Sequence, residues 1–232
     1  MAIPAASSND SPDPNSSDSI ASSDVPRTLV IETATAACSV ALIAGGSVIA
    51  AFHEEVGRGH AERLVPMISE LPDGGRAERI LVDCGPGSFT GVRVGLAAAV
   101  GLGIGWGVPV HGYGSLSLVA AAAFRDDPGS ERLAVVLEGG HGQVFMQHFT
   151  AQPLEAATPL QSLYPQDALA ACAGLAAIGS GVPRLLALDP AYPARDALPR
   201  AADAPLLPAN AAALPPRPIY GRAPDAKPQV RA

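Results

Sequence analysis

Aromatic residues are scarce in this chain, and the features of a nucleic-acid-binding surface are also missing. Only 4% of the 232 residues are aromatic while 48% are hydrophobic, so Ala, Val, Leu and Ile must fill the core. The formal net charge is -7, and the basic residues are scattered. Because Lys and Arg supply most non-specific affinity for phosphates, this pattern argues against a protein that grips nucleic acid by itself.

Cysteines are few and lack the spacing of a metal or redox site. Cys38, Cys84 and Cys172 lie far apart in the sequence, and no C-x-x-C pair occurs. A disulfide framework is typical of much smaller secreted domains. We therefore interpret all three as reduced, mostly buried small apolar residues.

Targeting signals are also missing from the first 26 residues. This stretch is rich in Ser, Asp and Pro and has no Lys or Arg, whereas a secretory signal needs a basic start and a transit peptide is Arg-rich. Its composition cannot bury enough apolar surface to offset the entropy of ordering, so we expect a disordered tail. We also hypothesise that the natural chain starts near Val25. The expected location is cytoplasmic.

The longest uncharged run, residues 94–110, is slightly short for a bilayer. It is interrupted by five glycines and by Pro109. We expect a helix in the core of a soluble lobe and no membrane span.

Three apolar runs in succession predict that the first lobe opens with an antiparallel β-meander. Arg27–Glu32 is typical of a buried strand, and residues 38–44 form a second strand. The pair Gly45 and Gly46 then makes a hairpin turn into a third strand over residues 47–54.

Helices and strands alternate after the meander, which indicates an α/β fold. Residues 60–71 predict an amphipathic helix, with Leu64, Ile68 and Leu71 on one face. A strand over Arg79–Asp83 and a helix over residues 90–106 follow.

A polar break at residues 126–130 marks the expected boundary between two lobes. Strands over residues 132–138 and 143–150 open the second lobe, and the chain becomes Ala- and Pro-rich from residue 197. The predicted division is a tail over 1–26, an N-terminal lobe with a partner interface over 27–125, and a C-terminal lobe with a Pro/Ala-rich tail over 126–232.

A glycine-rich segment, Gly-Pro-Gly-Ser-Phe-Thr-Gly-Val-Arg, lies between the predicted strand and helix at residues 85–93. Such a turn can cradle an anion, because backbone N–H groups and the helix dipole point outward. It lacks the Lys of a phosphate-binding P-loop and the G-x-G-x-x-G spacing of a dinucleotide site. A packed turn with a capped helix is therefore the favoured interpretation.

The helix after this segment carries small residues at every fourth position, which are Gly91, Gly95, Ala99, Gly103 and Gly107. Glycine inside a helix costs about 0.5–1 kcal/mol relative to Ala, so a stripe of glycines indicates that another backbone approaches closely. That backbone belongs either to the helix's own sheet or to a helix of another chain.

Several segments together resemble the TsaB (YeaZ) family. They are residues 31–42, the Arg-Gly-His-Ala-Glu-Arg-Leu-Val-Pro stretch at 58–66, the glycine-rich segment at 85–93 and the tail at 218–226. The resemblance is dense over residues 28–116 and sparse in the second lobe. It departs from the family's pattern at residues 138–142, at the short stretch 72–79 and at Gly221.

The resemblance implies an α/β, actin/Hsp70-like (ASKHA, ribonuclease H-like) two-lobe fold and a scaffold role without catalysis. Family members bind the catalytic subunit TsaD, and a small ATPase, TsaE, joins them. The complex uses ATP and threonylcarbamoyl-adenylate to modify the adenosine beside the tRNA anticodon. We therefore expect that this chain has no cofactor or metal of its own, contacts tRNA only through the complex, and can form a homodimer when the partner is absent.

The family's interface is formed by its first two helices, which fits the two stripes. The residues expected at the partner interface are Arg58, His60, Leu64, Met67, Ile68, Gly91, Arg93, Gly95, Ala99 and Gly103.

Two enzymatic alternatives remain open. A metal-dependent, peptidase-like or carbamoyl-transferring catalytic subunit would need a His-x-x-x-His pair on a helix, and the five histidines include none. An actin-like ATPase would need a glycine-rich first turn, where this chain has residues 34–37 without glycine. We interpret Glu32 as structural, and we do not interpret Ser88 as a nucleophile, since no base lies near it in the sequence.

Overall fold

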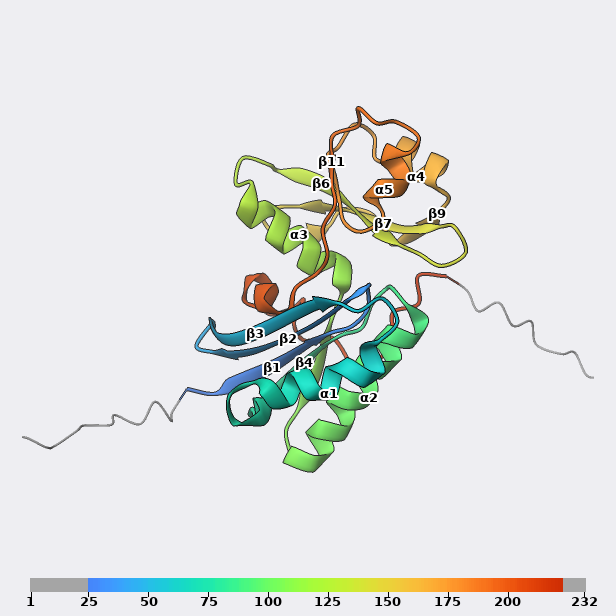
Figure 1. Cartoon of the computed structure of the whole chain (residues 1–232). Coiled ribbons are helices and arrows are strands. Elements are labelled where there is room, and N and C mark those ends of the chain that lie inside the picture. The colour runs from blue at the N-terminus through green and yellow to red at the C-terminus, as the bar shows by residue number, and fades with distance from the viewer. Residues whose placement is uncertain (1–24, 223–232) are drawn as a thin grey trace, which may run out of the picture.

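The computed structural model describes residues 25–222, which form two lobes, one above the other in Figure 1. The predicted disordered tail and the hypothesis of a start near Val25 concern residues 1–24, which lie outside the described residues. The last part of the resembling tail, from residue 223, also lies outside them.

The N-terminal lobe is built on a five-stranded sheet of order β3-β2-β1-β4-β5. The first three strands are antiparallel neighbours, which confirms the predicted meander, whereas β4 and β5 run parallel to β1. The strands are β1 (Arg27–Glu32), β2 (Ala37–Ala44), β3 (Ser47–Glu55), β4 (Arg79–Asp83) and β5 (Val110–Tyr113).

Helices cover both faces of this sheet, as parallel connections require. Two of them, α1 (His60–Glu70) and α2 (Phe89–Trp106), lie side by side on one face, with the short η1 (Pro72–Gly75) after α1 (Figure 1). On the other face, α3 (Ser115–Asp126) lies between the two lobes (Figure 1). Its buried residues Leu116 and Leu118 pack into two different apolar cores, one in each lobe.

The C-terminal lobe contains a second sheet of order β11-β10-β6-β7-β8, in which β9 also pairs with β7. Its longest strands, β6 (Arg132–Glu138) and β7 (Val144–Thr150), form the predicted hairpin around a Gly-Gly-His-Gly turn. The other elements are β8 (Glu155–Ala156), β9 (Gln161–Leu163), α4 (Pro165–Ala171), β10 (Ala177–Ile178), α5 (Val182–Leu186) and β11 (Ala194–Arg195).

The predicted C-terminal lobe of residues 126–232 needs a correction, because the chain returns to the first lobe. The short η2 (Ala201–Leu206) packs on β1, β2 and β3. Leu214 forms an isolated β-bridge with Gly112, and the Ile219 N–H donates to the Cys84 carbonyl over 2.8 Å. Residues 201–219 therefore belong to the N-terminal lobe, which the Ala/Pro-rich composition did not reveal.

The small-residue stripe of α2 faces its own sheet. A Cβ atom on Gly91 would overlap the Thr33 carbonyl oxygen, and one on Gly95 would overlap the Thr33 hydroxyl. Gly103 meets Val110 in the same way, and Ala99 is fully buried. The placement of these four residues at a partner surface is thus corrected. Thr33, just after β1, and Val110 of β5 already fill the space beside the glycines, and Ala99 has no exposed surface.

The apolar stripe of α1 also points inward. Leu64, Met67 and Ile68 are at most 4% exposed and belong to the core between α1, α2 and the sheet. They cannot also present their side chains to another chain. A partner that binds these helices must contact their opposite faces.

Two glycines of α2 provide a matched test of this packing. We expect Gly91→Ala to lower the free energy of unfolding by about 1–3 kcal/mol, because the new methyl group overlaps the backbone of Thr33. Gly101 has no atom within 4 Å of its Cβ position, so Gly101→Ala should raise stability by about 0.5–1 kcal/mol. Urea denaturation followed by circular dichroism measures both. Equal effects of the two substitutions would contradict the inward orientation of the stripe.

Candidate functional site

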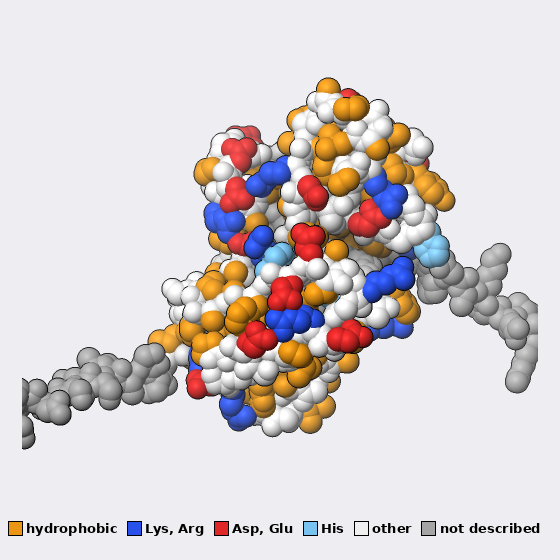
Figure 2. Space-filling model, in the orientation of Figure 1, with side chains coloured by type: hydrophobic (Ala, Val, Ile, Leu, Met, Phe, Trp, Pro, Cys, Tyr) orange, Lys and Arg blue, Asp and Glu red, His pale blue; other side chains and the backbone are white. Residues whose placement is uncertain are grey.

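Large apolar side chains are exposed on the outer faces of α1 and α2, although the outer face of α1 also carries Glu62 and Glu70. Ile104 is 79% exposed, Val100 is 40% exposed and Val65 of α1 is 62% exposed. Figure 2 shows hydrophobic side chains gathered over the lower part of the N-terminal lobe, where the two helices lie. Exposed apolar clusters of this kind mark interaction surfaces.

By length and composition alone, α2 is also the one helix within residues 25–222 that could cross a membrane, and 33% of its apolar window is buried. Its inner face packs against the sheet, which agrees with the expected core helix. The absence of a membrane partner and the cytoplasmic location stay predictions.

The three polar residues expected at the interface edge have different environments. Arg58 is exposed in the turn before α1. His60 is only 3% exposed, and its Nε2 lies 3.1 Å from the Ala37 carbonyl oxygen. It therefore connects α1 to β2 inside the fold and is not accessible at the surface. Arg93 is exposed near the start of α2, where its guanidinium stacks on Phe89. Only Arg58 and Arg93 remain available to a partner.

The glycine-rich segment is a packed turn against the end of β1. The Ser88 N–H donates to the Ala34 carbonyl over 2.6 Å, and a Cβ on Gly87 would overlap the same carbonyl. Ser88 caps α2, because its hydroxyl oxygen accepts the Gly91 N–H over 3.2 Å. The favoured interpretation of this segment as a packed turn with a capped helix is confirmed.

A buried polar cluster lies directly behind this turn, where the carboxyl ends of β1, β4 and β5 meet. Glu32, Asp83 and Tyr113 end these three strands, Ser115 begins α3, and all four residues are 0% exposed. Asp83 accepts the Gly85 N–H over 2.7 Å and the Ser115 hydroxyl over 2.6 Å. Glu32 accepts the Ala34 N–H over 2.8 Å and the Tyr113 hydroxyl over 3.2 Å.

The two carboxyls of this cluster lie close enough for each to shift the pKa of the other. Burial raises the pKa of Glu32 well above its ordinary value of 4.5, and the charge of Asp83 raises it further. Burial also raises the pKa of Asp83, but the hydrogen bonds from Glu32, Ser115 and Gly85 oppose that shift. The causes thus favour the protonated form at Glu32 and the ionised form at Asp83.

The structural role expected for Glu32 fits this geometry, since a fully buried carboxyl reaches neither solvent nor substrate. Its partners Asp83, Tyr113 and Ser115 were not identified from the sequence. An acid or hydroxyl at the carboxyl end of each predicted parallel strand is the signal that could have suggested them.

In the first hairpin turn, where an actin-like ATPase would bind phosphate, two N–H groups are used internally. The Ala34 N–H is bound by Glu32 and the Ala37 N–H by the Thr35 hydroxyl over 3.3 Å. The glycine-rich segment covers the same turn. Within residues 25–222, no group of three or more His, Cys, Asp or Glu side chains is arranged to hold a metal ion.

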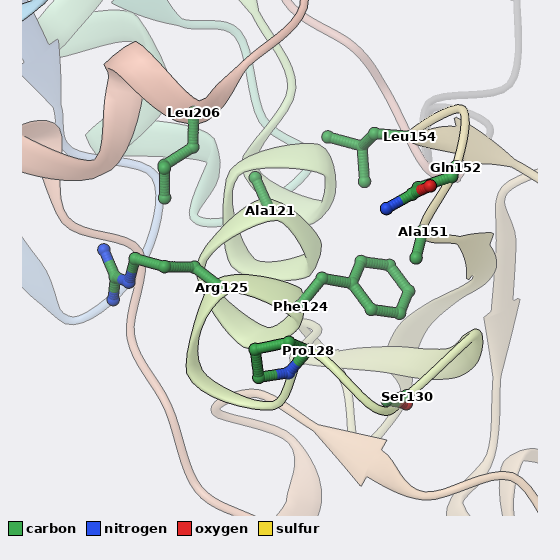
Figure 3. A pocket seen from close by; sticks show the side chains of 9 residues that line it. All are labelled: Ala121, Phe124, Arg125, Pro128, Ser130, Ala151, Gln152, Leu154 and Leu206. Atoms are coloured by element: carbon green, nitrogen blue, oxygen red, sulfur yellow. The ribbon is translucent and has the colours of Figure 1, made fainter.

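A separate pocket of about 270 Å³ lies between α3 and the turn after β7 (Figure 3). Its walls are mostly apolar, with Phe124 and Leu154 facing each other across it. Arg125 points away from Phe124 and Gln152, and its guanidinium is bound by Asp126 and Asp203 (Figure 3). The pocket thus offers little polar chemistry and is not part of the α1–α2 surface.

The buried pair predicts a pH dependence of stability. Above the ordinary Glu pKa of 4.5, the unfolded chain releases a proton that the folded chain retains on Glu32. Stability from this group is therefore complete below pH 4.5 and is lost as the pH rises toward the raised pKa, by up to about 1.4 kcal/mol per pH unit. We expect Glu32→Gln, which stays neutral, to flatten this slope in urea titrations up to about pH 8.

Glu62→Gln on the exposed surface of α1 serves as the control and should leave the slope as in the wild type. A Glu32→Gln slope equal to that of the wild type would disprove the raised pKa of Glu32.

The chain resembles proteins of tRNA modification. The family model described as TsaD, tRNA N6-adenosine threonylcarbamoyltransferase, matches residues 51–172, just over half of the chain. The tRNA threonylcarbamoyladenosine biosynthesis protein TsaB of Escherichia coli K12 is 38% identical over 128 residues, which are 53% of this chain and 54% of that protein. The TsaB of Haemophilus influenzae is 42% identical over 102 residues, or 42% of this chain and 43% of that protein. This chain spans about half the length of the curated relatives it matches.

Two solved structures share the architecture of both lobes. A Pseudomonas aeruginosa protein described as similar to the peptidase YEAZ superposes with a TM-score of 0.72 at 28% identity, over 85% of this chain and 100% of that one. YeaZ from Pseudomonas aeruginosa gives a TM-score of 0.69 at 27% identity, over 84% and 99% of the two chains. These matches confirm the expected α/β, actin/Hsp70-like two-lobe fold. With the family model and the curated relatives, they show that the chain belongs to the TsaB (YeaZ) family.

Proposed function

We propose that this chain is a non-catalytic scaffold subunit required for threonylcarbamoyl transfer to the adenosine beside the tRNA anticodon. It acts by binding a TsaD-like catalytic subunit, which a TsaE-like ATPase joins. The names of the relatives in tRNA threonylcarbamoyladenosine biosynthesis support this role. ATP and threonylcarbamoyl-adenylate are used by the complex, and this chain binds neither as a cofactor of its own.

The exposed outer face of α1 and α2 is the observation that carries the proposal. Val65, Val100 and Ile104 are large apolar side chains that the fold leaves in solvent. Burial of such side chains contributes about 1.5–3 kcal/mol each, which is a strong driving force for association. The interface expected from the resemblance is thereby retained on the same helices but moved to their outer faces.

The scaffold role, as opposed to an enzymatic one, is supported by where the acids lie. Glu32 and Asp83 occupy the carboxyl ends of the parallel strands, where open α/β sheets commonly bind ligands. Both are 0% exposed and are bonded to backbone and side chains of the chain itself. A TsaD-like partner would supply the chemistry, and tRNA would be bound within the complex.

A charge on the outer face of α2 tests the interface. We expect Ile104→Glu to weaken binding of a TsaD-like subunit at least about tenfold in calorimetry, because a buried, unpaired carboxylate opposes association. The same change should disrupt a homodimer, measured by analytical ultracentrifugation without the partner. Since Ile104 is 79% exposed, the fold should tolerate it.

Ile49→Glu is the matched control, because Ile49 is 48% exposed on the edge strand β3, away from α2. Wild-type affinity of Ile104→Glu would overturn the interface, and an equal loss in both variants would show that charge alone was responsible.

A reconstituted tRNA modification reaction tests the function itself. With the TsaD-like and TsaE-like proteins, ATP and threonylcarbamoyl-adenylate supply, we expect modified adenosine only when this chain is present. Ile104→Glu should reduce the yield in proportion to complex formation, measured by nucleoside mass spectrometry. Full modification without this chain would refute the scaffold role, and modification by this chain alone would show that it is an enzyme.

A further inference from the structure

An exposed cluster of two aromatic rings and one guanidinium lies at the first turns of α2. The Arg93 guanidinium carbon is 3.5 Å from the centre of the Phe89 ring, and its Nη2 donates to the Tyr220 hydroxyl over 3.0 Å. The two rings are 6.5 Å apart and tilted by 33°. The core of the fold does not require this cluster, because Phe89 is 62% and Tyr220 57% exposed.

The cluster is held in place from both sides. Phe89 and Arg93 are four residues apart on α2, so their side chains share one face of the helix. On the other side, the Ile219 N–H is bonded to the Cys84 carbonyl, and Gly221 lies against the Phe145 ring. These contacts fix the chain on both sides of Tyr220. The Tyr220 hydroxyl, held in this way, orients the guanidinium plane of Arg93.

The C-terminal segment of this chain, which contains Tyr220, has a local excess of positive charge. Four of the 15 Lys and Arg residues but only one of the 22 acids fall in the last 16 residues, which follow Pro216. The basic residues are Arg217 and Arg222, together with Lys227 and Arg231, which lie outside the described residues. The acidic composition of the whole chain conceals this excess, and Tyr220 lies within it.

We propose that Phe89, Arg93 and Tyr220 form a stacking platform for an unpaired base of single-stranded RNA. Aromatic rings and Arg guanidinium planes are the groups on which splayed RNA bases stack, and nearby cations neutralise phosphates. A plane already oriented by Phe89 and Tyr220 loses little freedom when a base binds. The choice of RNA rests on the proposed function, in which a tRNA is the substrate of the complex.

The platform is separate from the proposed protein interface on the same helix. Arg93 and Ile104 are eleven residues apart, which corresponds to about 16 Å along a helix. The apolar surface lies toward the C-terminal end of α2, whereas the cation and the aromatic rings lie at its start. A charged, flat cluster suits a base, while the apolar end suits a protein.

A second Arg–aromatic contact on α2 provides the comparison. Arg76 lies 5.9 Å from the centre of the Trp106 ring at the opposite end of the helix. That contact is looser than the one at Phe89, and Tyr220 packs at the other end of the helix. It should not bind RNA.

The test uses the full chain and a fluorescein-labelled eight-nucleotide oligouridine in anisotropy titrations at several salt concentrations. We expect Arg93→Lys, which keeps the charge but loses the plane, to weaken binding at least about fivefold. The slope of log affinity against log salt should stay unchanged, because the number of cations is the same. Arg76→Lys should bind as the wild type. A duplex RNA of the same length should compete poorly, since its bases are paired.

Photocrosslinking with a 4-thiouridine oligonucleotide should place the adduct on Phe89 or Tyr220. Undetectable binding, wild-type affinity of Arg93→Lys, an equal loss in Arg76→Lys or adducts elsewhere would overturn the platform. Loss of TsaD-like partner binding in Arg93→Lys, with oligouridine binding unchanged, would assign the cluster to protein instead. The RNA titration needs no partner protein. Its result can therefore be interpreted even if the proposed scaffold role fails.

Discussion

The close approach of α2 to the end of β1 is the constraint on which the rest of the N-terminal lobe depends. Gly87, Gly91 and Gly95 leave no room for a Cβ atom because Thr33 and Ala34 fill that space. The Thr33 hydroxyl also donates to the Gly91 carbonyl over 2.8 Å, so the contact is polar as well as tight. A helix seated this deeply has only its opposite face to offer, and that face carries the exposed Val100 and Ile104.

The buried carboxyl pair stabilises the same junction from behind. Asp83 binds the N–H of Gly85, the first residue of the glycine-rich turn, and Glu32 binds that of Ala34, on which the turn packs. Two ionised carboxylates in this position would repel each other and lack solvation, which is why burial and the charge of Asp83 raise the pKa of Glu32. Acids that in an open site would serve a ligand here hold the turn that starts α2.

The sequence predicted local elements well because their signals are local. The meander follows from three apolar runs with a Gly45–Gly46 turn, and the capped start of α2 follows from Ser88 beside glycines. The sequence did not show which neighbour the glycine stripe of α2 faces, because a helix face of small residues can pack equally well against a sheet of the same chain or a helix of another chain. Asp83, Tyr113 and Ser115 escaped notice because only the parallel pairing of β4 and β5 brings them together. The return of residues 201–219 to the first lobe depends on backbone bonds of Leu214 and Ile219, which leave no trace in composition.

The return of the chain also explains how one helix can serve two kinds of contact. Residues 214–221 run from the edge of β5 past Cys84 to the Phe145 ring of the second lobe, and so bring Tyr220 to the first turns of α2. Without this segment, Arg93 would have only Phe89 to hold it. With it, the start of α2 becomes a rigid, cationic and aromatic surface, while the end of α2 stays apolar. The RNA contact proposed for this acidic protein is therefore confined to one small place, because the fold brings together there two residues that are 127 positions apart in the sequence.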